Sequence, residues 1–308
     1  MTALPVAGAP VLVSGANGFT GRFVCRELQR RKIPFIALLR PGRDAAWLSS
    51  QQISVRFADL NNPSELAAAL QGCRALLNVA SIGFGAVPTI LQACAAVGVN
   101  RAVFVSTTAI FTQLNASSKA VRLAAESDIQ ACGLDWTILR PTMIYGTPAD
   151  RNMIRLLQWL ERWPLLPIFG KGRSLQQPVH VTDVAWAVVE VLNQPASHHR
   201  AFNISGASPL TYNKIVQIAA RALGKEARLL HLPAALFIRI LQFTEWLGLK
   251  LPIKAEQIQR VNEEKVFDHQ EAAEVFGFSP IAFPQGIKQE VSLYRVGADG
   301  LSLADPQS

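Results

Sequence analysis

The stretch Pro10-Val-Leu-Val-Ser-Gly-Ala-Asn-Gly-Phe-Thr-Gly21 decides the fold of this chain. Its first five residues, Pro10 to Ser14, form an apolar run typical of a buried parallel strand, and a helical pattern begins after the last glycine. Glycines recur at every third position, at Gly15, Gly18 and Gly21. In such a unit the first glycine permits the tight turn, the second lets the backbone approach a pyrophosphate, and the third lets helix and strand pack closely. The turn therefore predicts a dinucleotide site at the start of a helix.

The sequence around this unit repeats the same alternation up to about residue 145. Short apolar runs predict strands at 35–39, 76–79, 102–106 and 135–139, and amphipathic patterns predict helices at 23–29, 63–70 and 118–131. Parallel strands joined by right-handed helical crossovers produce this order. We expect an α/β fold, a Rossmann-type doubly wound parallel sheet with a smaller, mainly helical C-terminal substrate domain.

The two predicted domains interleave along the chain. After Gly146 the pattern predicts a helix at 152–163 and then a stretch rich in proline and glycine. Strand and helix patterns return at 177–192 and end with a strand at 202–205, and helices are predicted at 212–223, 234–247 and 256–264. We expect a dinucleotide-binding domain of residues 1–146 and 177–205, and a substrate-binding region of residues 147–176 and 206–308.

Composition excludes several classes of protein. Of the 308 residues 50% are hydrophobic and 17% charged, so the chain can bury a large core. The net charge of +8 is scattered, and we expect no nucleic-acid partner. The four cysteines, Cys25, Cys73, Cys94 and Cys132, show no metal-binding spacing, which predicts no metal site and a reducing compartment.

Neither of two apolar segments fits a membrane or export signal. No Lys or Arg precedes Arg22, so we expect no cleavable signal peptide. The uncharged segment between Arg74 and Arg101 contains Asn78 and Pro88, and it fits a buried strand, a loop and a helix better than a bilayer span. We therefore expect a cytoplasmic protein.

The GxxGxxG spacing resembles the short-chain dehydrogenase/reductase superfamily, and later motifs resemble its extended epimerase/dehydratase branch. In chain order these motifs are Asp59-Leu60, Asn78-Val-Ala-Ser81, Ser106-Thr-Thr108, Leu139-Arg-Pro141, Ile144-Tyr-Gly146, Val179-His-Val-Thr-Asp-Val-Ala185 and Asn203-Ile-Ser-Gly206. The resemblance covers nearly the whole chain. It implies that the cofactor is bound by Gly15, Asn17, Gly18, Phe19, Gly21, Asp59, Leu60, Val79, Ala80, Ser81, Ser106, Thr107, Pro141, Met143 and Ile144.

The end of the second predicted strand bears on which dinucleotide is bound. It reads Leu39-Arg40-Pro-Gly-Arg43, where a site specific for NAD would normally place an acidic residue on the ribose hydroxyls. A guanidinium can bind a 2'-phosphate with two hydrogen bonds, so Arg40 and Arg43 favour NADP. NAD stays open, because the sequence does not show whether Arg40 points inward.

The catalytic pair that the resemblance implies is missing. Active members use a tyrosine with a lysine four residues later, and the chain has no YxxxK. One register of the equivalent helix places Lys119 at the lysine and Asn115 at the tyrosine. The other, which preserves the helix length into the next strand, places Ser118 at the tyrosine and Arg122 at the lysine. Thr108 is the best placed hydroxyl for a substrate oxygen.

Two other side chains could exchange a proton, but packing explains them better. Tyr145 is expected to pack at a strand end, and His180 to sit as a core or loop histidine.

Two functions remain open on these observations. The first is an NADP-dependent oxidoreductase or epimerase acting on a nucleotide sugar or a related carbonyl or hydroxyl compound. The second is an inactive, NADP(H)-binding structural or redox-sensing protein, similar to the complex I accessory subunit of this branch or to NmrA-like proteins. A homodimer is compatible with both.

The predicted helix 152–163 is apolar over more than one face. Trp159 and Trp163 lie among basic residues, a pattern that fits a peripheral membrane contact. The alternative is that helices 152–163 and 234–247 pack together to build the substrate domain.

Overall fold

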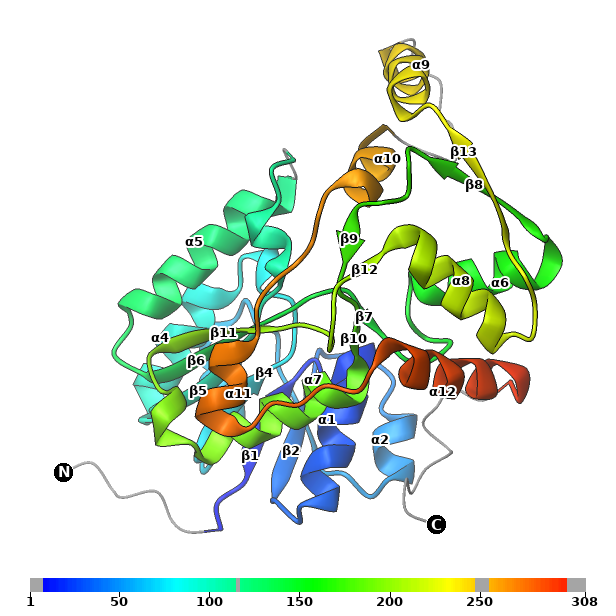
Figure 1. The fold of residues 1–308 in the computed structure, drawn as a ribbon. Coiled ribbons are helices and arrows are strands. Elements are labelled where there is room, and N and C mark those ends of the chain that lie inside the picture. The colour runs from blue at the N-terminus through cyan, green and yellow to red at the C-terminus, as the bar shows by residue number, and fades with distance from the viewer. Residues whose placement is uncertain (1–7, 115–116, 247–254, 298–308) are drawn as a thin grey trace.

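The computed structural model describes residues 8–114, 117–246 and 255–297. At its centre lies a seven-stranded sheet of order β11-β6-β5-β4-β1-β2-β3, in which all the pairs are parallel (Figure 1). The strands are β1 Val11–Ser14, β2 Phe35–Leu39, β3 Val55–Phe57, β4 Ala75–Asn78, β5 Arg101–Val105, β6 Asp135–Pro141 and β11 Arg200–Ile204. The α/β fold of Rossmann type is confirmed.

Helices cover both faces of the sheet. On one face α1 (Phe19–Arg30) packs against α7 (Val181–Glu190), and on the other lie α3 (Pro63–Leu70), α4 (Val87–Val97) and α5 (Ser117–Ala131). The strand pleat explains this division, because Val11 and Val13 belong to the cluster around α1 and α7, whereas Leu12 belongs to the cluster around α3 and α4. A short helix, α2 (Ala46–Ser50), follows β2.

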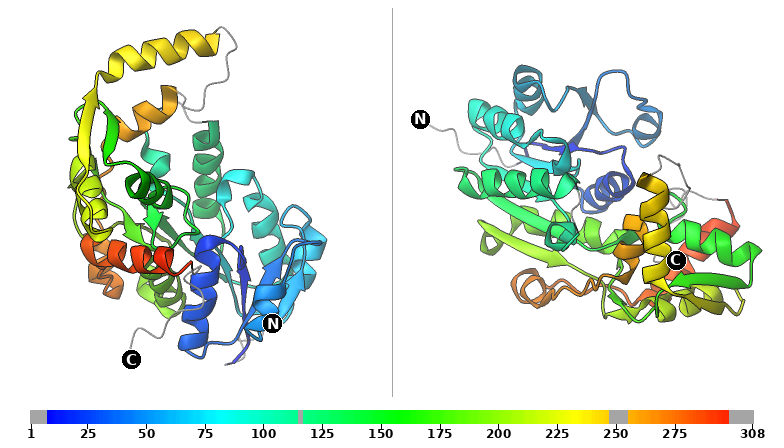
Figure 2. Two further views of the ribbon diagram at one scale, coloured as in Figure 1. Left: turned by 90° about the vertical axis from the view of Figure 1, so that its right-hand side faces the viewer. Right: turned by 90° about the horizontal axis from the view of Figure 1, so that it is seen from above.

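The smaller half is built around a third apolar cluster. Helices α6 (Met153–Arg162), α8 (Tyr212–Ala222) and α12 (Phe283–Arg295) share it with a parallel two-stranded ribbon, β8 (Leu165–Phe169) and β13 (Arg228–Leu232). At the far end of this ribbon, α9 (Ala234–Trp246) packs against α10 (Ala255–Asn262) (Figure 2). Helices α6 and α9 therefore pack mainly on different partners, α6 on α8 and β8, and α9 on α10. Residue 247 of the predicted helix 234–247 lies outside the described residues.

Short elements connect the halves. Strand β7 (Ile144–Tyr145) pairs with β10 (Val179–His180), and β9 (Leu175–Gln176) pairs with β12 (Leu210–Thr211). The strand predicted near residue 177 is the two-residue β10, which pairs with β7 outside the main sheet. It ends at His180, because the His180 side chain caps α7 by accepting the N–H of Thr182. Helix α11 (Gln270–Phe276) returns to the larger half, where Phe276 joins its core. Helix α11, which lies in the range predicted for the substrate-binding region, thus packs on the larger half.

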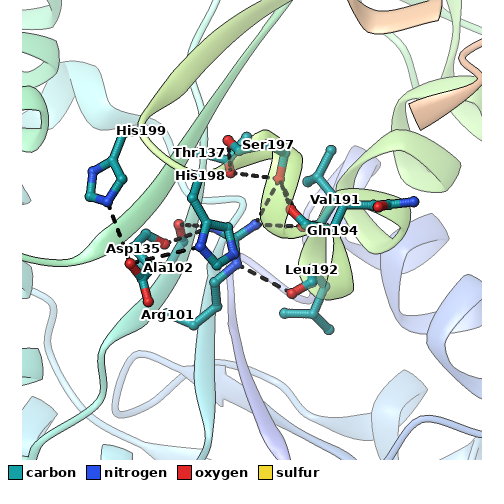
Figure 3. Close-up of polar contacts among 10 residues, drawn as sticks. All are labelled: Arg101, Ala102, Asp135, Thr137, Val191, Leu192, Gln194, Ser197, His198 and His199. Atoms are coloured by element: carbon teal, nitrogen blue, oxygen red, sulfur yellow. Dashed lines mark hydrogen bonds and ion pairs between the residues drawn. The ribbon is translucent and has the colours of Figure 1, made fainter. Parts of the chain in front are cut away.

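A buried arginine holds the amino edge of the sheet, at the end of the strands away from the glycine turn. Figure 3 shows the guanidinium of Arg101, the first residue of β5, among main-chain carbonyls. Its N–H groups donate to the carbonyl oxygens of Asp135 (2.6 Å), Val191 (2.5 Å) and Leu192 (3.2 Å). Burial lowers its pKa to about 10. The contacts fasten the 3-10 turn η3 (Val191–Asn193) to the sheet and leave the opposite, carboxyl edge for a site.

Candidate functional site

The glycine turn lies where the strand order reverses, between β1 and β4. Open α/β sheets bind their ligands in the crevice at such a point. Gly15 has a φ of +68°, and a Cβ there would stand 2.6 Å from the nitrogen of Ala80. Gly18 closes the turn by donating its N–H to the carbonyl of Gly15 at 2.9 Å, and a Cβ on Gly21 would overlap that same carbonyl. The turn therefore needs glycine at the first and third positions.

A hydrogen-bond network fixes the end of β4 beside this turn. The hydroxyl of Ser14 donates to the Asn78 side chain at 2.6 Å, and the Asn78 amide donates to the carbonyl of Ala80 at 3.0 Å. Val79 donates its N–H to the carbonyl of Ser14 at 3.2 Å. Ser81 follows, exposed, with its hydroxyl accepting the N–H of Gly83 in η1 (Ile82–Phe84). The structure thus brings Val79, Ala80 and Ser81 together with the glycine turn, as the resemblance implies.

The N-terminus of α1 is suited to an anion. Gly18 is its N-cap and supplies no side-chain acceptor, and no acidic residue lies in the first turn. The N–H groups of this turn and the positive end of the helix dipole can therefore act on a phosphate. Phe19 packs edge-on against Phe23, on the helix flank.

Asn17 links the glycine turn to the loop after β2. Its amide donates to the carbonyl of Asp44, and its side-chain oxygen accepts the Nε–H of Arg22, both at 2.9 Å. The loop contains Arg40 and Arg43, whose exposed side chains have no ion pair within the part of the chain that the structure describes. The loop that carries these two arginines is thus fastened to the glycine turn.

Asp59 and Leu60 lie half-buried after β3. The Asp59 carboxylate accepts the N–H of Asn61 at 2.9 Å, and its own N–H donates to Glu65 at 2.9 Å. The loop is held by its own residues and leaves one carboxylate oxygen of Asp59 without a bond within the described residues.

An internal carboxylate engages the hydroxyl of Ser106. Its hydroxyl donates to Glu126 of α5 at 2.5 Å, and Glu126 also receives two N–H groups of Arg140 at 3.0 and 2.5 Å. Arg140 in turn lies over the ring of Phe111 in η2 (Thr108–Phe111). The sequence signals this buried ion pair only by placing a charge inside the apolar run of β6. Thr107 caps η2 through the N–H of Ala109.

The catalytic candidates divide into two groups. Arg122 donates to the hydroxyl of Ser118 at 2.7 Å and lies against Gly83, where a Cβ would stand 3.0 Å from its Nε. Lys119 instead donates to the carbonyl of Thr112 at 2.5 Å. The Ser118 and Arg122 pair thus borders the end of β4, whereas Lys119 fastens the loop after η2.

The remaining candidate, Thr108, is buried and makes only a long bond of 3.4 Å to the carbonyl of Pro141. Met143 and Ile144 follow, both half-buried. Asn115, the tyrosine position in the first register, lies outside the described residues.

Tyr145 and His180 pack together away from solvent. Their ring centroids are 5.3 Å apart, and Tyr145 is 0% exposed. Burial raises the pKa of Tyr145 far above its usual range and lowers that of His180 to about 4. Both groups are therefore neutral core residues near pH 7, and neither can exchange a proton readily.

The sequence reasoning missed a buried carboxyl pair beside them. Glu290 of α12 is 0% exposed and accepts the N–H of Gly146 at 3.0 Å. Burial and the neighbouring Asp150 raise its pKa to about 10. Asp150 accepts the N–H groups of Asn152 and Met153, each at 2.8 Å. With its pKa raised, Glu290 is protonated at neutral pH. A charge on the apolar face of α12, three residues after Ile287, is the only sequence signal.

Comparison with known proteins agrees with this geometry. The model of the NAD(P)H-binding family matches residues 15–195. The NAD(P)H azoreductase of Xenophilus azovorans is 26% identical over 228 residues, which cover 71% of this chain and 75% of that protein. The 2-alkyl-3-oxoalkanoate reductase of Shewanella oneidensis is 25% identical over 266 residues, covering 70% and 67%.

Solved structures share the fold. The UDP-glucose 4-epimerase of Thermotoga maritima, solved with UDP-glucose, has a TM-score of 0.73 at 16% identity over 94% of this chain and 99% of its own. MoeE5, solved with UDP-glucose and NAD, has a TM-score of 0.71 at 20% identity over 94% and 99%. At these identities the likeness shows the fold alone, and the fold is the one that the motifs suggested. The protein belongs to the NAD(P)H-binding family, whose matched region runs from the first glycine of the turn through α7.

Proposed function

We propose that the protein is an NADP(H)-dependent oxidoreductase that acts on a carbonyl or hydroxyl group of a small molecule. The observation that carries the proposal is the Ser118 and Arg122 pair, hydrogen-bonded at 2.7 Å and lying against η1 at the end of β4. It supplies a hydroxyl and a fixed cation at the edge of the sheet where the glycine turn would hold the cofactor.

The preference for NADP(H) rests on charge. Arg40 and Arg43 are exposed at the end of β2, and Asn17 ties their loop to the glycine turn. The nearest acidic residue, Asp44, is engaged in capping α2 through the N–H of Ala46 at 2.8 Å. Two arginines without a carboxylate partner in the described residues favour a 2'-phosphate over a free hydroxyl.

The cofactor supplies a hydride to the substrate carbon when it is bound. Because Arg122 donates to the Ser118 oxygen, the Ser118 hydroxyl is free to donate its own proton to a substrate carbonyl oxygen. The guanidinium then stabilises the negative charge that develops on the Ser118 oxygen. Serine is too weak an acid to act alone at neutral pH, so the proton that completes the alcohol comes from water through the Ser118 hydroxyl. Hydride and proton together balance the reduction.

The substrate class is part of the proposal. A nucleotide sugar is the first candidate, because structures of this fold have been solved with UDP-glucose. The relatives named as an azoreductase and an oxoalkanoate reductase also favour an azo group or a ketone as the group that is reduced.

A second function is supported by one observation. The three tyrosines of the chain do not supply the missing acid, because Tyr145 is buried and Tyr212 and Tyr294 lie on α8 and α12 in the smaller half. A protein that holds NADP(H) as a structural element or redox sensor, as in the complex I accessory subunit of this branch or NmrA-like proteins, would need no such group.

One experiment separates the two functions. The purified protein is analysed by mass spectrometry for a co-purifying nucleotide, and the loss of NADPH absorbance is then followed with a panel of carbonyl compounds and UDP-sugars. Turnover that falls at least about tenfold in Ser118→Ala, while the exposed neighbour variant Ser127→Ala is unchanged, supports the oxidoreductase. Tight NADPH binding without turnover across the panel supports the second function instead.

We propose further that the protein lies in the cytoplasm and that it can form a homodimer. Both are compatible with the fold. None of the helices in the described residues is long and apolar enough to span a membrane.

A further inference from the structure

The outward face of α6 alternates arginine and tryptophan. Residues 155, 159 and 162 recur at helical spacing, and Trp163 follows as the extended C-cap residue. Arg155, Trp159, Arg162 and Trp163 are all exposed. Trp159 is 42% and Trp163 59% exposed, while Leu157 and Leu160 on the opposite side fill the core of the smaller half. The core therefore accounts for one side of this helix and leaves two indoles outside it.

The ribbon beside α6 continues the apolar surface. The indole N–H of Trp159 donates to the carbonyl of Leu165 in β8 at 3.0 Å, which places Trp159 on the start of the ribbon. Leu166 and Ile168 point into the core, so Leu165 points outward by strand alternation. In β13 the outward residue Leu230, paired with Pro167, is likewise exposed.

Helix α9 extends the surface at the other end of the ribbon, which leads directly into it (Figures 1 and 2). Its first turn carries Leu236, which is exposed, while Phe237 and Leu241 turn inward against α10. We call the exposed residues Trp159, Trp163, Leu165, Leu230 and Leu236 the α6–α9 rim. The elements that carry the rim, α6, β8, β13 and α9, lie along one margin of the smaller half, away from the seven-stranded sheet (Figure 1).

Arginines outnumber the exposed acidic residues Glu161 and Glu226 around the rim. Arg155, Arg162, Arg228 and Arg239 are exposed, and none of them has an ion pair recorded within the described residues. The carboxylate of Glu161 on α6 is held by the hydroxyl of Tyr294 in α12. Tryptophans and leucines among unpaired arginines match an interface between acyl chains and anionic headgroups.

We propose that the α6–α9 rim docks the protein on a membrane surface that contains anionic lipids. A second copy of the chain fits this surface less well. A two-fold contact through the rim would bring two sets of four arginines together around one apolar patch, and like charges would oppose it. An anionic lipid surface satisfies both the apolar and the charged residues.

The test is co-sedimentation of the full chain with phosphatidylcholine vesicles, with or without a third of the lipid as phosphatidylserine. The wild type should pellet with the anionic vesicles at low salt and be released by added salt, because the attraction is screened. Trp159→Ser with Trp163→Ser should weaken partitioning by more than about tenfold. Arg155→Gln with Arg162→Gln, which leaves the core untouched, should weaken it about thirtyfold.

Phe57→Ser is the matched control, because Phe57 is an exposed aromatic residue on the edge strand β3 of the other half. It should pellet like the wild type. The proposal is overturned if the wild type stays in solution with anionic vesicles at low salt, or if all variants pellet equally. It is also overturned if the rim variants abolish only self-association, measured by sedimentation velocity, because the rim is then an interface between copies.

Discussion

Replacing Glu290 by glutamine should stabilise the protein at alkaline pH. Glu290 is 0% exposed, its pKa is raised to about 10 by burial and by Asp150, and in the unfolded chain it titrates near 4.5. The folded state therefore keeps a proton that the unfolded state has lost, and stability falls as pH rises between these two values. A glutamine keeps an acceptor for the N–H of Gly146 and can donate its amide to Asp150.

The expected size follows from the linkage. One proton retained in the folded state costs about 1.36 kcal/mol per pH unit, so between about pH 7 and about pH 9 the wild type should lose about 2.7 kcal/mol more than the variant. His180 does not contribute to the change in stability over this pH range. Its pKa is lowered to about 4 by burial, so its effect on stability appears only as pH falls below its unfolded value of 6.5. Urea unfolding at several pH values, followed by fluorescence, measures the difference. Parallel stability curves for wild type and Glu290→Gln would refute a protonated Glu290 in the folded state.

Three further substitutions test the fold and the site. Gly21→Ala should lower the free energy of unfolding by about 1 to 3 kcal/mol and weaken NADPH binding, because its Cβ overlaps the Gly15 carbonyl. Denaturation and calorimetry measure the two effects. In the control Gly133→Ala no atom lies within 4 Å of the new Cβ, so it should be neutral, and equal effects of both variants would contradict the turn geometry. Arg101→Met should lower the free energy of unfolding by about 3 kcal/mol, because buried carbonyls lose a charged donor. The control Arg200→Met breaks an exposed ion pair with Glu271 and should lower it by under about 1 kcal/mol. Glu126→Gln should cost about 1 to 3 kcal/mol in urea unfolding by leaving Arg140 unpaired; an unchanged midpoint would show that the ion pair adds nothing.

Elements with strong local signals were predictable from the sequence. The helix at 63–70 agrees with α3 at both ends, because Pro63 occupies the first turn and the Asn62 side chain accepts the N–H groups of Ser64 and Glu65. The glycine turn follows equally from local requirements, since its geometry admits no Cβ at Gly15 or Gly21.

Elements that depend on distant partners were not predictable. Strand β8 contains Pro167 and pairs with β13 some sixty residues later, so no short-range pattern marks it. Strand β10 is only two residues long because α7 begins at Val181. The sequence leaves open whether the apolar helices 152–163 and 234–247 pack on each other, and the ribbon carries α9 to α10 instead.

The site shows the same division. Backbone positions such as Val79, Ala80 and Ser81 follow from the order of the strands. Side-chain partners do not, because the hydroxyl of Ser106 is taken by Glu126 and the ammonium of Lys119 by the carbonyl of Thr112. Such choices are made by tertiary packing, and only the structure reveals them.

The most direct measurement is the affinity for NADPH and NADH by isothermal calorimetry, in the wild type and in Arg40→Asp. The proposed 2'-phosphate lies beside the guanidinium of Arg40 after β2, which has no ion pair within the part of the chain that the structure describes. The wild type should prefer NADPH, and the variant should lose about 1 to 3 kcal/mol of NADPH binding while NADH binding is unchanged. An equal loss for both nucleotides, or no loss for either, would contradict it.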